Sequence, residues 1–429
     1  MAALRLLIVA GLCLMLAAAA GSGRAGTAAL LAASSGSVDS ESSSVPATSI
    51  DAGYIHTCAL TGAGVKCWGS NRRNQLGDHT VKYSTTPVDV SGLTGDVTAI
   101  TLGSRHGCAL TTAGGLKCWG YNRYGQLGDG TTVNRTMPVD VSGLSGGVTA
   151  IAASFHTCAL TSAGGVKCWG SNPAGELGDG TREDRSTPVD VSGLSSGVTA
   201  IAAGDSHTCA VTSSGGVKCW GDNSSGQLGD GTRRDRSTPV DVSGLSGGVT
   251  ALGAGGLHSC ALTLTGGIKC WGANASGQLG DGTTRVRSRP VDVSGLGARV
   301  ITIAAGLRHT CALTSAGGIK CWGLNLHGQL GDGTFFDRSR PVDVFGLSRG
   351  LTAVAVGGFY GCGRTRAGGV KCWGNNIYGQ LGDGTEENHR RPVSVVGFGP
   401  AQATLAIVSR SVRITPAGVA AIRLRCGEA

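Results

Sequence analysis

The segment Val148–Leu194 reads VTAIAASFHTCALTSAGGVKCWGSNPAGELGDGTREDRSTPVDVSGL, and close copies of it fill most of the 429-residue chain. Each copy carries a tryptophan that is preceded by Lys-Cys and followed by Gly, at Trp68, Trp119, Trp169, Trp220, Trp271, Trp322 and Trp373. The spacing between successive tryptophans is 51, 50, 51, 51, 51 and 51 residues. Seven copies of one unit therefore run from Ala47 to Gly397.

No copy contains a ten-residue stretch of helical periodicity, and each has four short β-favouring runs separated by Gly, Ser, Asn, Asp or Pro. In the third copy, Cys158 and Leu160 face one side of the expected hairpin and Trp169 faces the other, so both sides carry apolar bulk. Pro188 is expected to open the fourth strand at a sheet edge. The sequence therefore predicts an all-β fold, a seven-bladed β-propeller whose four-stranded repeats bury both faces against their neighbours.

Composition excludes several other classes. The chain has 75 Gly residues, but Gly does not recur at every third position as collagen requires, and 41% hydrophobic content argues against disorder. The formal charge is +9, of which the last thirty residues supply a net +3. The remainder is too small for a nucleic-acid-binding stripe, so no nucleic-acid partner is expected.

The chain ends are expected to differ from the repeats. Arg5 precedes an apolar run, Leu6–Ala20, that is typical of a signal peptide over residues 1–26, with a retained anchor as the alternative. Residues 27–46 are predicted to be a flexible linker, 47–398 the propeller, and 399–429 a β-like tail, either a truncated domain or a strand that docks on the propeller. No membrane span is expected once the signal is removed.

Fourteen cysteines form seven pairs that flank the same predicted hairpin turn: Cys58 and Cys67, Cys108 and Cys118, Cys158 and Cys168, Cys209 and Cys219, Cys260 and Cys270, Cys311 and Cys321, and Cys362 and Cys372. The first copy lacks one residue, yet a shorter turn at Gly62–Ala63 keeps its cysteines opposed, as a covalent bond would require. Disulfides are predicted, since opposed strand cysteines lie within bonding reach. Free buried thiols or a metal site are the alternatives. Cys426 is left over, as a free thiol, an intermolecular link or the partner of a residue beyond this end.

No catalytic residue, metal or cofactor is expected. A histidine precedes the first cysteine in six copies, with Tyr360 in the seventh, but equivalent residues of different blades are too far apart to share a metal ion. A structural histidine bonded to the backbone is the favoured interpretation. The GxSxG match at Gly143–Gly147 recurs in Gly-rich turns without the strand-to-helix elbow that a nucleophile needs. The Asp of each LGDGT segment is expected to accept the N–H groups of its own turn.

The pattern HTCAL…GGVKCWGxNxxGQLGDGT…PVxV resembles the regulator-of-chromosome-condensation repeat family over about 350 residues. The WGxNxxGQLG core is intact in five copies, while the first copy has Asn74 for Gly and the third has Glu176 for Gln. The resemblance, which extends to secreted bacterial members, implies a seven-bladed propeller that acts by protein recognition. Activities known in the family are nucleotide exchange on a small nuclear GTPase, chromatin docking and inhibition of β-lactamases.

We therefore expect a secreted or cell-surface, monomeric, non-enzymatic module that binds an unidentified protein or cell-envelope polymer. The alternative is a regulator of a small GTPase with guanine-nucleotide exchange activity. Loop residues of copies one, two, six and seven are aromatic, basic or apolar where copies three to five are small and polar. Since those copies are contiguous on a closed ring, the predicted partner-binding residues are Tyr54, Arg72, Arg73, Tyr83, Arg105, Tyr121, Arg123, Tyr124, His327, Phe335, Phe336, Phe359, Tyr360 and Tyr378.

Overall fold

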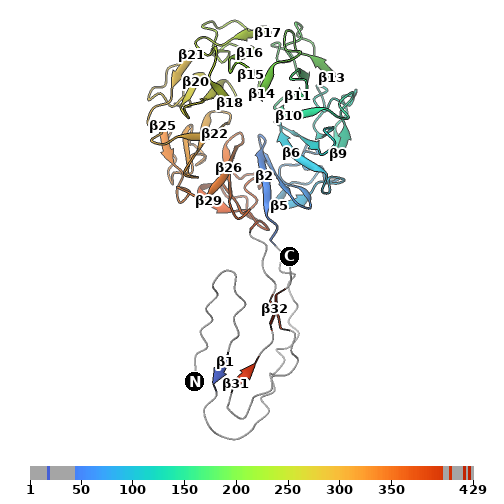
Figure 1. Cartoon of the computed structure of the whole chain (residues 1–429), viewed down its shortest axis with the longest axis vertical. Helices are drawn as coiled ribbons and strands as arrows, with labels where there is room; N and C mark the ends of the chain where they lie inside the picture. Colours follow the sequence, from blue (N-terminus) through green and yellow to red (C-terminus); the bar gives the residue numbers. More distant parts are fainter. Residues whose placement is uncertain (1–16, 20–43, 400–404, 408–418, 422–423, 427–429) are drawn as a thin grey trace. The chain divides into compact units, whose positions relative to one another are not determined.

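A computed structural model describes residues 44–399 and the short segments 17–19, 405–407, 419–421 and 424–426. Residues 44–399 contain seven four-stranded antiparallel sheets that are arranged as blades around a central axis (Figure 1). Each blade comes from one repeat, and its strands follow the chain order from the axis outward. The predicted all-β, seven-bladed propeller is confirmed, with no helix among the residues that the structure describes.

The first four blades comprise β2 (Ala47–Ala52), β3 (His56–Thr61), β4 (Gly64–Gly69) and β5 (Ser84–Asp89); β6 (Val97–Leu102), β7 (His106–Thr111), β8 (Leu116–Gly120) and β9 (Arg135–Asp140); β10 (Val148–Ala153), β11 (His156–Thr161), β12 (Val166–Gly170) and β13 (Arg185–Asp190); and β14 (Val198–Ala203), β15 (His207–Thr212), β16 (Val217–Gly221) and β17 (Arg236–Asp241). The last three comprise β18 (Val249–Ala254), β19 (His258–Thr263), β20 (Ile268–Gly272) and β21 (Arg287–Asp292); β22 (Val300–Ala305), β23 (His309–Thr314), β24 (Ile319–Gly323) and β25 (Arg338–Asp343); and β26 (Leu351–Val356), β27 (Tyr360–Thr365), β28 (Val370–Gly374) and β29 (His389–Ser394).

A second unit contains two short strand pairs, β1 (Ala17–Ala19) with β31 (Val419–Ala421) and β30 (Leu405–Ile407) with β32 (Leu424–Cys426). The predicted signal peptide and linker lie almost wholly outside the described residues, as do most of the predicted tail and the side chain of Cys426. None of the described residues forms a helix long and apolar enough to cross a membrane.

The central hairpin of each blade has the register that the cysteine spacing predicted. In blade three, Cys158 lies opposite Cys168 and Thr157 lies opposite Trp169. In blade one, Thr61 pairs with Gly64, so the turn shrinks to two residues and the opposition of the cysteines is kept. All seven predicted disulfides are formed, and they join Cys58 to Cys67, Cys108 to Cys118, Cys158 to Cys168, Cys209 to Cys219, Cys260 to Cys270, Cys311 to Cys321, and Cys362 to Cys372.

The fourth strand differs from the sequence prediction in one respect. Pro188 does not open it, because β13 begins at Arg185. Arg185 pairs with Gly170 and Val189 with Cys168, so a bulge of β13 lies opposite a single residue of β12. Pro188 falls in this bulge of an outer edge strand, where the missing N–H leaves no ladder bond unmade.

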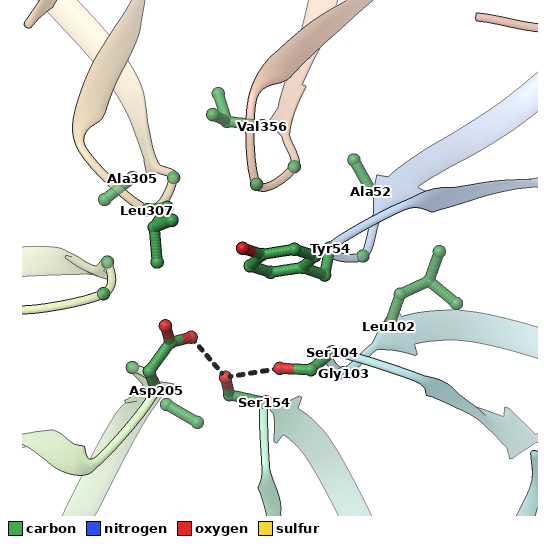
Figure 2. A pocket seen from close by; sticks show the side chains of 18 of the residues that line it. Ala52, Tyr54, Leu102, Gly103, Ser104, Ser154, Asp205, Ala305, Leu307 and Val356 are labelled. Carbon is green, nitrogen blue, oxygen red and sulfur yellow. Dashed lines mark hydrogen bonds between the residues drawn. The ribbon is translucent and has the colours of Figure 1, made fainter. Parts of the chain in front are cut away.

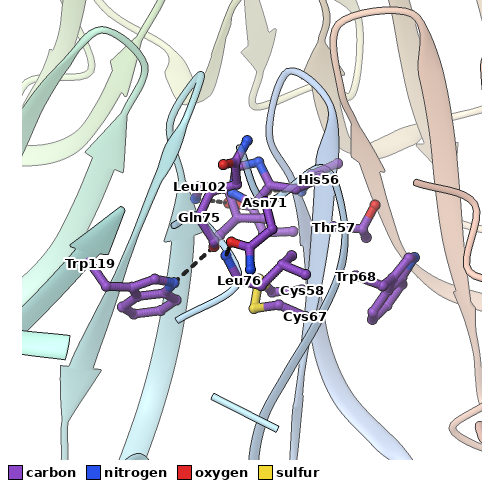
Figure 3. Close-up of a disulfide and its surroundings, with 12 residues drawn as sticks. His56, Thr57, Cys58, Cys67, Trp68, Asn71, Gln75, Leu76, Leu102 and Trp119 are labelled. Carbon is purple, nitrogen blue, oxygen red and sulfur yellow. Dashed lines mark hydrogen bonds between the residues drawn. A yellow bond between two sulfur atoms is a disulfide. The ribbon is translucent and has the colours of Figure 1, made fainter. Parts of the chain in front are cut away.

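Neighbouring blades pack the cysteine side of one sheet against the tryptophan side of the next. One core cluster joins Cys108, Leu110 and Leu127 of blade two to Ala159 and Trp169 of blade three. At the seam between blades one and two, Trp119 packs beside the blade-one disulfide (Figure 3). All seven tryptophans are fully buried, so each seam of the ring buries a large aromatic ring that neither blade could bury alone.

A polar chain also crosses the blade seams. The Trp169 indole N–H and the Thr157 hydroxyl both donate to the carbonyl oxygen of Gln126 in the preceding blade, each over 2.9 Å. His106 Nε2 lies 2.8 Å from the Thr157 hydroxyl oxygen. Because the single hydroxyl hydrogen goes to Gln126, the imidazole must donate from Nε2. The expectation of a backbone-bonded histidine is therefore wrong here: the bond is to a side-chain hydroxyl of the next blade.

The same bond recurs from His156, His207 and His258 to a hydroxyl of the following blade. The positions that would supply this hydroxyl to His56 and His309 are Gly107 and Gly361. All six histidines are fully buried, and burial lowers their pKa values from 6.5 to about 3 or about 4. They are neutral structural groups in the folded protein.

Tyr360 takes the histidine position in blade seven and helps to close the ring. Its hydroxyl donates to the backbone oxygen of His56 over 2.5 Å and accepts from Thr57 over 2.9 Å. Val45 forms a parallel bridge with Phe398, and its N–H donates to the oxygen of Gly397. Side-chain hydrogen bonds and one short bridge thus join blades seven and one, each of which keeps its own four strands.

The aspartate of each LGDGT segment behaves as predicted. In blade two, Asp129 Oδ1 accepts from the Thr131 N–H over 3.0 Å, and Asp129 Oδ2 pairs with Arg135 at 2.7 Å. Burial acts to raise the pKa of Asp129, but the hydrogen bonds from Thr131, Arg135 and Asn122 outweigh it, and the net pKa is lowered. The residue fixes its own loop.

Candidate partner-binding face

One face of the propeller, called the loop face below, carries two connections from every blade. These are the turn between the first and second strands and the long loop between the third and fourth strands, residues 53–55 and 70–83 in blade one. Thirteen of the fourteen predicted partner-binding residues lie in these connections. The chain enters and leaves the propeller at the opposite face, where Ala47 bonds to Gly368 in a hairpin turn. The loop face is therefore free of the two chain ends of the propeller.

Near the axis, aromatic rings from three blades are in contact. The centroid of Phe359 in blade seven lies 5.9 Å from that of Tyr54 in blade one and 5.4 Å from that of His327 in blade six. Both pairs are edge-to-face, an arrangement that the quadrupoles of aromatic rings favour. All three side chains are partly exposed, so their rings offer apolar surface to a partner.

Further out, arginines of blade one lie over tyrosines of its two neighbours. The guanidinium carbon of Arg72 is 5.4 Å from the ring centroid of Tyr378 in blade seven, and that of Arg73 is 5.3 Å from the centroid of Tyr121 in blade two. Tyr121 in turn contacts Tyr124 at 6.0 Å. These cation–π and aromatic contacts hold the side chains in place across two blade seams.

The outer part of the face carries the most exposed aromatic groups. Phe336 is 73% exposed and Phe335 is 46% exposed, with the guanidinium carbon of Arg390 lying 5.5 Å from the Phe335 centroid. The hydroxyl of Tyr83 in blade one donates to a carboxylate oxygen of Glu386 in blade seven over 2.6 Å. Exposed phenylalanines are costly to leave in water, which is why such groups mark interaction surfaces.

The contacts join residues that lie at opposite ends of the sequence. They cross the seams between blades six and seven, seven and one, and one and two, and so bring the predicted sector together. Arg105 and Arg123 are exposed on the same face but make none of the ring contacts found among the described residues.

Tyr360 does not belong to the exposed set. It is fully buried and bonded across the ring closure, so its side chain is inaccessible to a partner in this structure. The sequence reasoning also missed two exposed apolar residues, Leu326 at 66% and Ile377 at 53%. Both occupy the first variable position of the NxxG segment, which is exposed in every blade, and comparing this column across the copies would have identified them.

The loops of blades three to five differ in both size and charge. The first variable position of their NxxG segments is Pro173, Ser224 and Ala275. Asp and Glu outnumber Lys and Arg by ten to seven in residues 148–248, whereas Lys and Arg prevail by fifteen to eight in residues 249–397. No group of three or more potential metal ligands occurs among the described residues.

Comparisons with known proteins agree with this architecture. A model of the RCC1-like domain matches residues 148–418, and models of the regulator of chromosome condensation (RCC1) repeat match residues 47–75, 65–110, 97–126 and 114–160. The ultraviolet-B receptor UVR8 of Arabidopsis thaliana is 32% identical over 353 residues, which cover 81% of this chain and 69% of the receptor. The human E3 ubiquitin-protein ligase HERC2 is 31% identical over 73% of this chain, but the match spans only 6% of the ligase.

Among solved structures, Prp20p of Saccharomyces cerevisiae superposes with a TM-score of 0.70 at 23% identity, covering 80% of this chain and 87% of that one. The human protein WBSCR16 superposes with a TM-score of 0.68 at 21% identity, covering 77% of this chain and 94% of that one. At these identities the likeness supports the fold alone. The match over more than half the chain and the 32% identity to a relative of similar extent carry the assignment. The chain belongs to the regulator of chromosome condensation (RCC1) repeat family.

Proposed function

We propose that this chain is a secreted or cell-surface binding module, and that it contacts a protein or cell-envelope polymer as a monomer through the loop face of blades six, seven, one and two. The observation that carries this proposal is the set of ring contacts that extends across these blades from His327 to Tyr124. Such contacts preorder bulky side chains, so less conformational entropy is lost when a partner binds. Tyrosine and arginine are also the residue types enriched at the energetic centres of interfaces.

The disulfides support the location. Each blade has one, and disulfides persist in oxidising environments, whereas cytosolic thiols are kept reduced. The alternative function, nucleotide exchange on a small GTPase, fits this chemistry less well, because such GTPases work in reducing compartments. It would become the better proposal if the protein proved to be retained in the cytosol with its cysteines reduced.

The test is capture of partners from culture supernatant and cell-envelope extracts with the purified propeller as bait. We expect that a variant with Tyr121, Tyr124, Phe335, Phe336 and Tyr378 replaced by Ser folds normally and loses the captured partner. The matched control changes the exposed loop positions Pro173, Ser224 and Ala275 to Asp. If binding survives the first variant and fails in the control, the partner-binding sector is on the other side of the ring.

A further inference from the structure

At the centre of the loop face, the seven inner turns surround the mouth of the axial channel. The last residue of each inner strand lines a cavity of about 80 Å³, together with the glycines that follow. This volume is enough for a few water molecules but well below the roughly 300 Å³ at which ordinary ligand pockets begin. The mouth can therefore admit one small chemical group rather than a whole cofactor.

The side chains at the mouth break the repeat. The residue after the turn glycine is Tyr54, Ser104, Asp205, Gly256, Leu307 or Gly358, and blade three has one residue fewer, with Ser154 in the glycine position. Figure 2 shows the Tyr54 ring reaching across the mouth, with Asp205 below it and Leu307 on the far side. One carboxylate thus stands in a ring of otherwise uncharged side chains.

Hydrogen bonds and close contacts fix this arrangement. The Ser154 hydroxyl donates to Asp205 Oδ1 over 3.0 Å, and the Asp205 N–H donates to the oxygen of Gly255 in the next blade over 3.3 Å. A Cβ atom at Gly358 would lie 3.2 Å from the Tyr54 ring, so the glycine leaves the space that the ring occupies. The carboxylate and the aromatic ring are consequently held in position before anything binds.

Asp205 has no cationic partner. No Lys, Arg or His nitrogen of the described part of the chain lies within 4 Å of its oxygens. Burial raises the pKa of Asp205, opposed by the hydrogen bond from Ser154. A buried carboxylate without a counter-ion is unfavourable, and a cation that entered the mouth would relieve this cost.

The rim above the carboxylate has the opposite charge. Arg105 and Arg308 are exposed on the turns of blades two and six. Both lie near Tyr54, since their charges lower its pKa while burial and Asp205 raise it more strongly. Any group that reaches Asp205 must pass between these guanidinium groups, so its surroundings should be acidic.

We propose that the axial mouth receives the ammonium group of a partner's lysine, with Asp205 as its counter-ion, and that carboxylates beside this lysine contact Arg105 and Arg308. The Tyr54 ring supplies a cation–π face, the Ser154 oxygen an additional acceptor, and Leu307 packs against the methylene groups. The inference rests on the proposed function in taking the loop face as the binding face. It adds that the partner is a protein that presents a lysine between acidic residues.

The direct test uses the capped peptide acetyl-Asp-Lys-Asp-amide as the probe, in titrations followed by calorimetry or NMR on the purified propeller. We expect weak, saturable binding that is lost when norleucine replaces the peptide's lysine. A charged hydrogen bond contributes about 1.5–3 kcal/mol, so Asp205→Asn should weaken binding by roughly 10- to 150-fold. Asp222→Asn is the matched control, because it removes the same charge from an exposed loop of the same blade.

A second variant keeps the proposal testable if Asp205→Asn fails to fold. Tyr54→Leu should lower the affinity about two- to fivefold, the effect of losing an exposed cation–π contact. Equal binding of the norleucine peptide, no binding of the lysine peptide, or full binding to Asp205→Asn would each overturn the lysine site. If the partner captured by the wild-type propeller still binds Asp205→Asn but not the five-Ser variant, the face is right and the lysine site is wrong. If it binds both, the face itself is wrong.

Discussion

The long loops of blades three and six have the same buried framework and different surfaces. In both, an asparagine accepts a hydrogen bond from a leucine N–H five residues later over 2.9 Å, at Asn172 and Asn325. In both, the asparagine amide also donates to the aspartate of the following turn, Asp179 or Asp332. The exposed positions, by contrast, are Pro, Ala, Arg and Glu in blade three and Leu, His, Phe and Phe in blade six.

This difference shows where each requirement acts. The asparagine, the aspartate and the buried leucine satisfy the loop's own polar groups, so they must recur in every blade. The exposed side chains satisfy nothing within the loop and are free to follow the partner. Stability should therefore respond strongly to changes in the framework and at the seams, and weakly to changes on the loop face.

Removing a blade should have the largest effect. A chain that ends before Leu351 lacks blade seven and exposes Leu313 and Leu330 of blade six together with Trp68 of blade one. Because repeat neighbours supply each other's core, we expect an insoluble product or one without a cooperative unfolding transition. The control is a chain that ends at Pro400. A soluble six-blade product that unfolds cooperatively would show that the seams matter less than we infer.

Acidification should have the next largest effect, because the six buried histidines are neutral. Their pKa values are about 3 to 4 in the folded protein, against an ordinary value of 6.5 in the unfolded chain. Below pH 6.5 the unfolded chain therefore takes up protons that the folded chain does not, and the free energy of unfolding falls with pH, by about 2 kcal/mol per histidine at pH 5. Asp51 and Glu176, whose pKa values burial raises to about 6 and about 7, bind protons in the folded state and oppose this by roughly 3 kcal/mol in total at pH 5.

Denaturant titrations at pH 7 and pH 5 measure the balance, and we expect a net loss of several kcal/mol. The loss should be smaller by about one histidine's share in His258→Gln. A stability that is equal at the two pH values would mean that the histidines are protonated in the folded protein, contrary to their burial.

The repeat, the blade order and the disulfide register follow from the sequence, because a fixed spacing and opposed cysteines constrain a hairpin directly. Contacts between blades were harder to predict. The hydroxyl acceptor of His106 lies 51 residues away at Thr157, and the buried position of Tyr360 depends on closure with blade one. Asp205 escaped notice for the same reason, since its neighbours at the mouth come from other blades and meet only in the closed ring.

One seam contact can be tested by a single substitution. Thr157→Val removes the acceptor of His106 and leaves a buried imidazole N–H unpaired, so we expect a loss of about 1–3 kcal/mol in the free energy of unfolding. Thr157→Ser is the control and should be close to neutral, because Ser259 makes the equivalent bonds in blade five. Equal effects of the two substitutions would locate the cost in packing instead of the hydrogen bond.

Exchanging the loop surfaces should have the smallest effect. Pro173→Leu, Ala174→His, Arg182→Phe and Glu183→Phe give blade three the exposed residues of blade six and leave Asn172 and Asp179 unchanged. Exposed substitutions away from structural contacts usually change stability by less than about 0.5 kcal/mol, so thermal unfolding should be almost unaffected. Asn172→Ala serves as the contrast: it removes the acceptor of the buried Leu177 N–H, which should cost at least about 1–3 kcal/mol. If the surface exchange proves as destabilising as Asn172→Ala, the exposed residues are part of the framework and cannot have been selected for a partner alone.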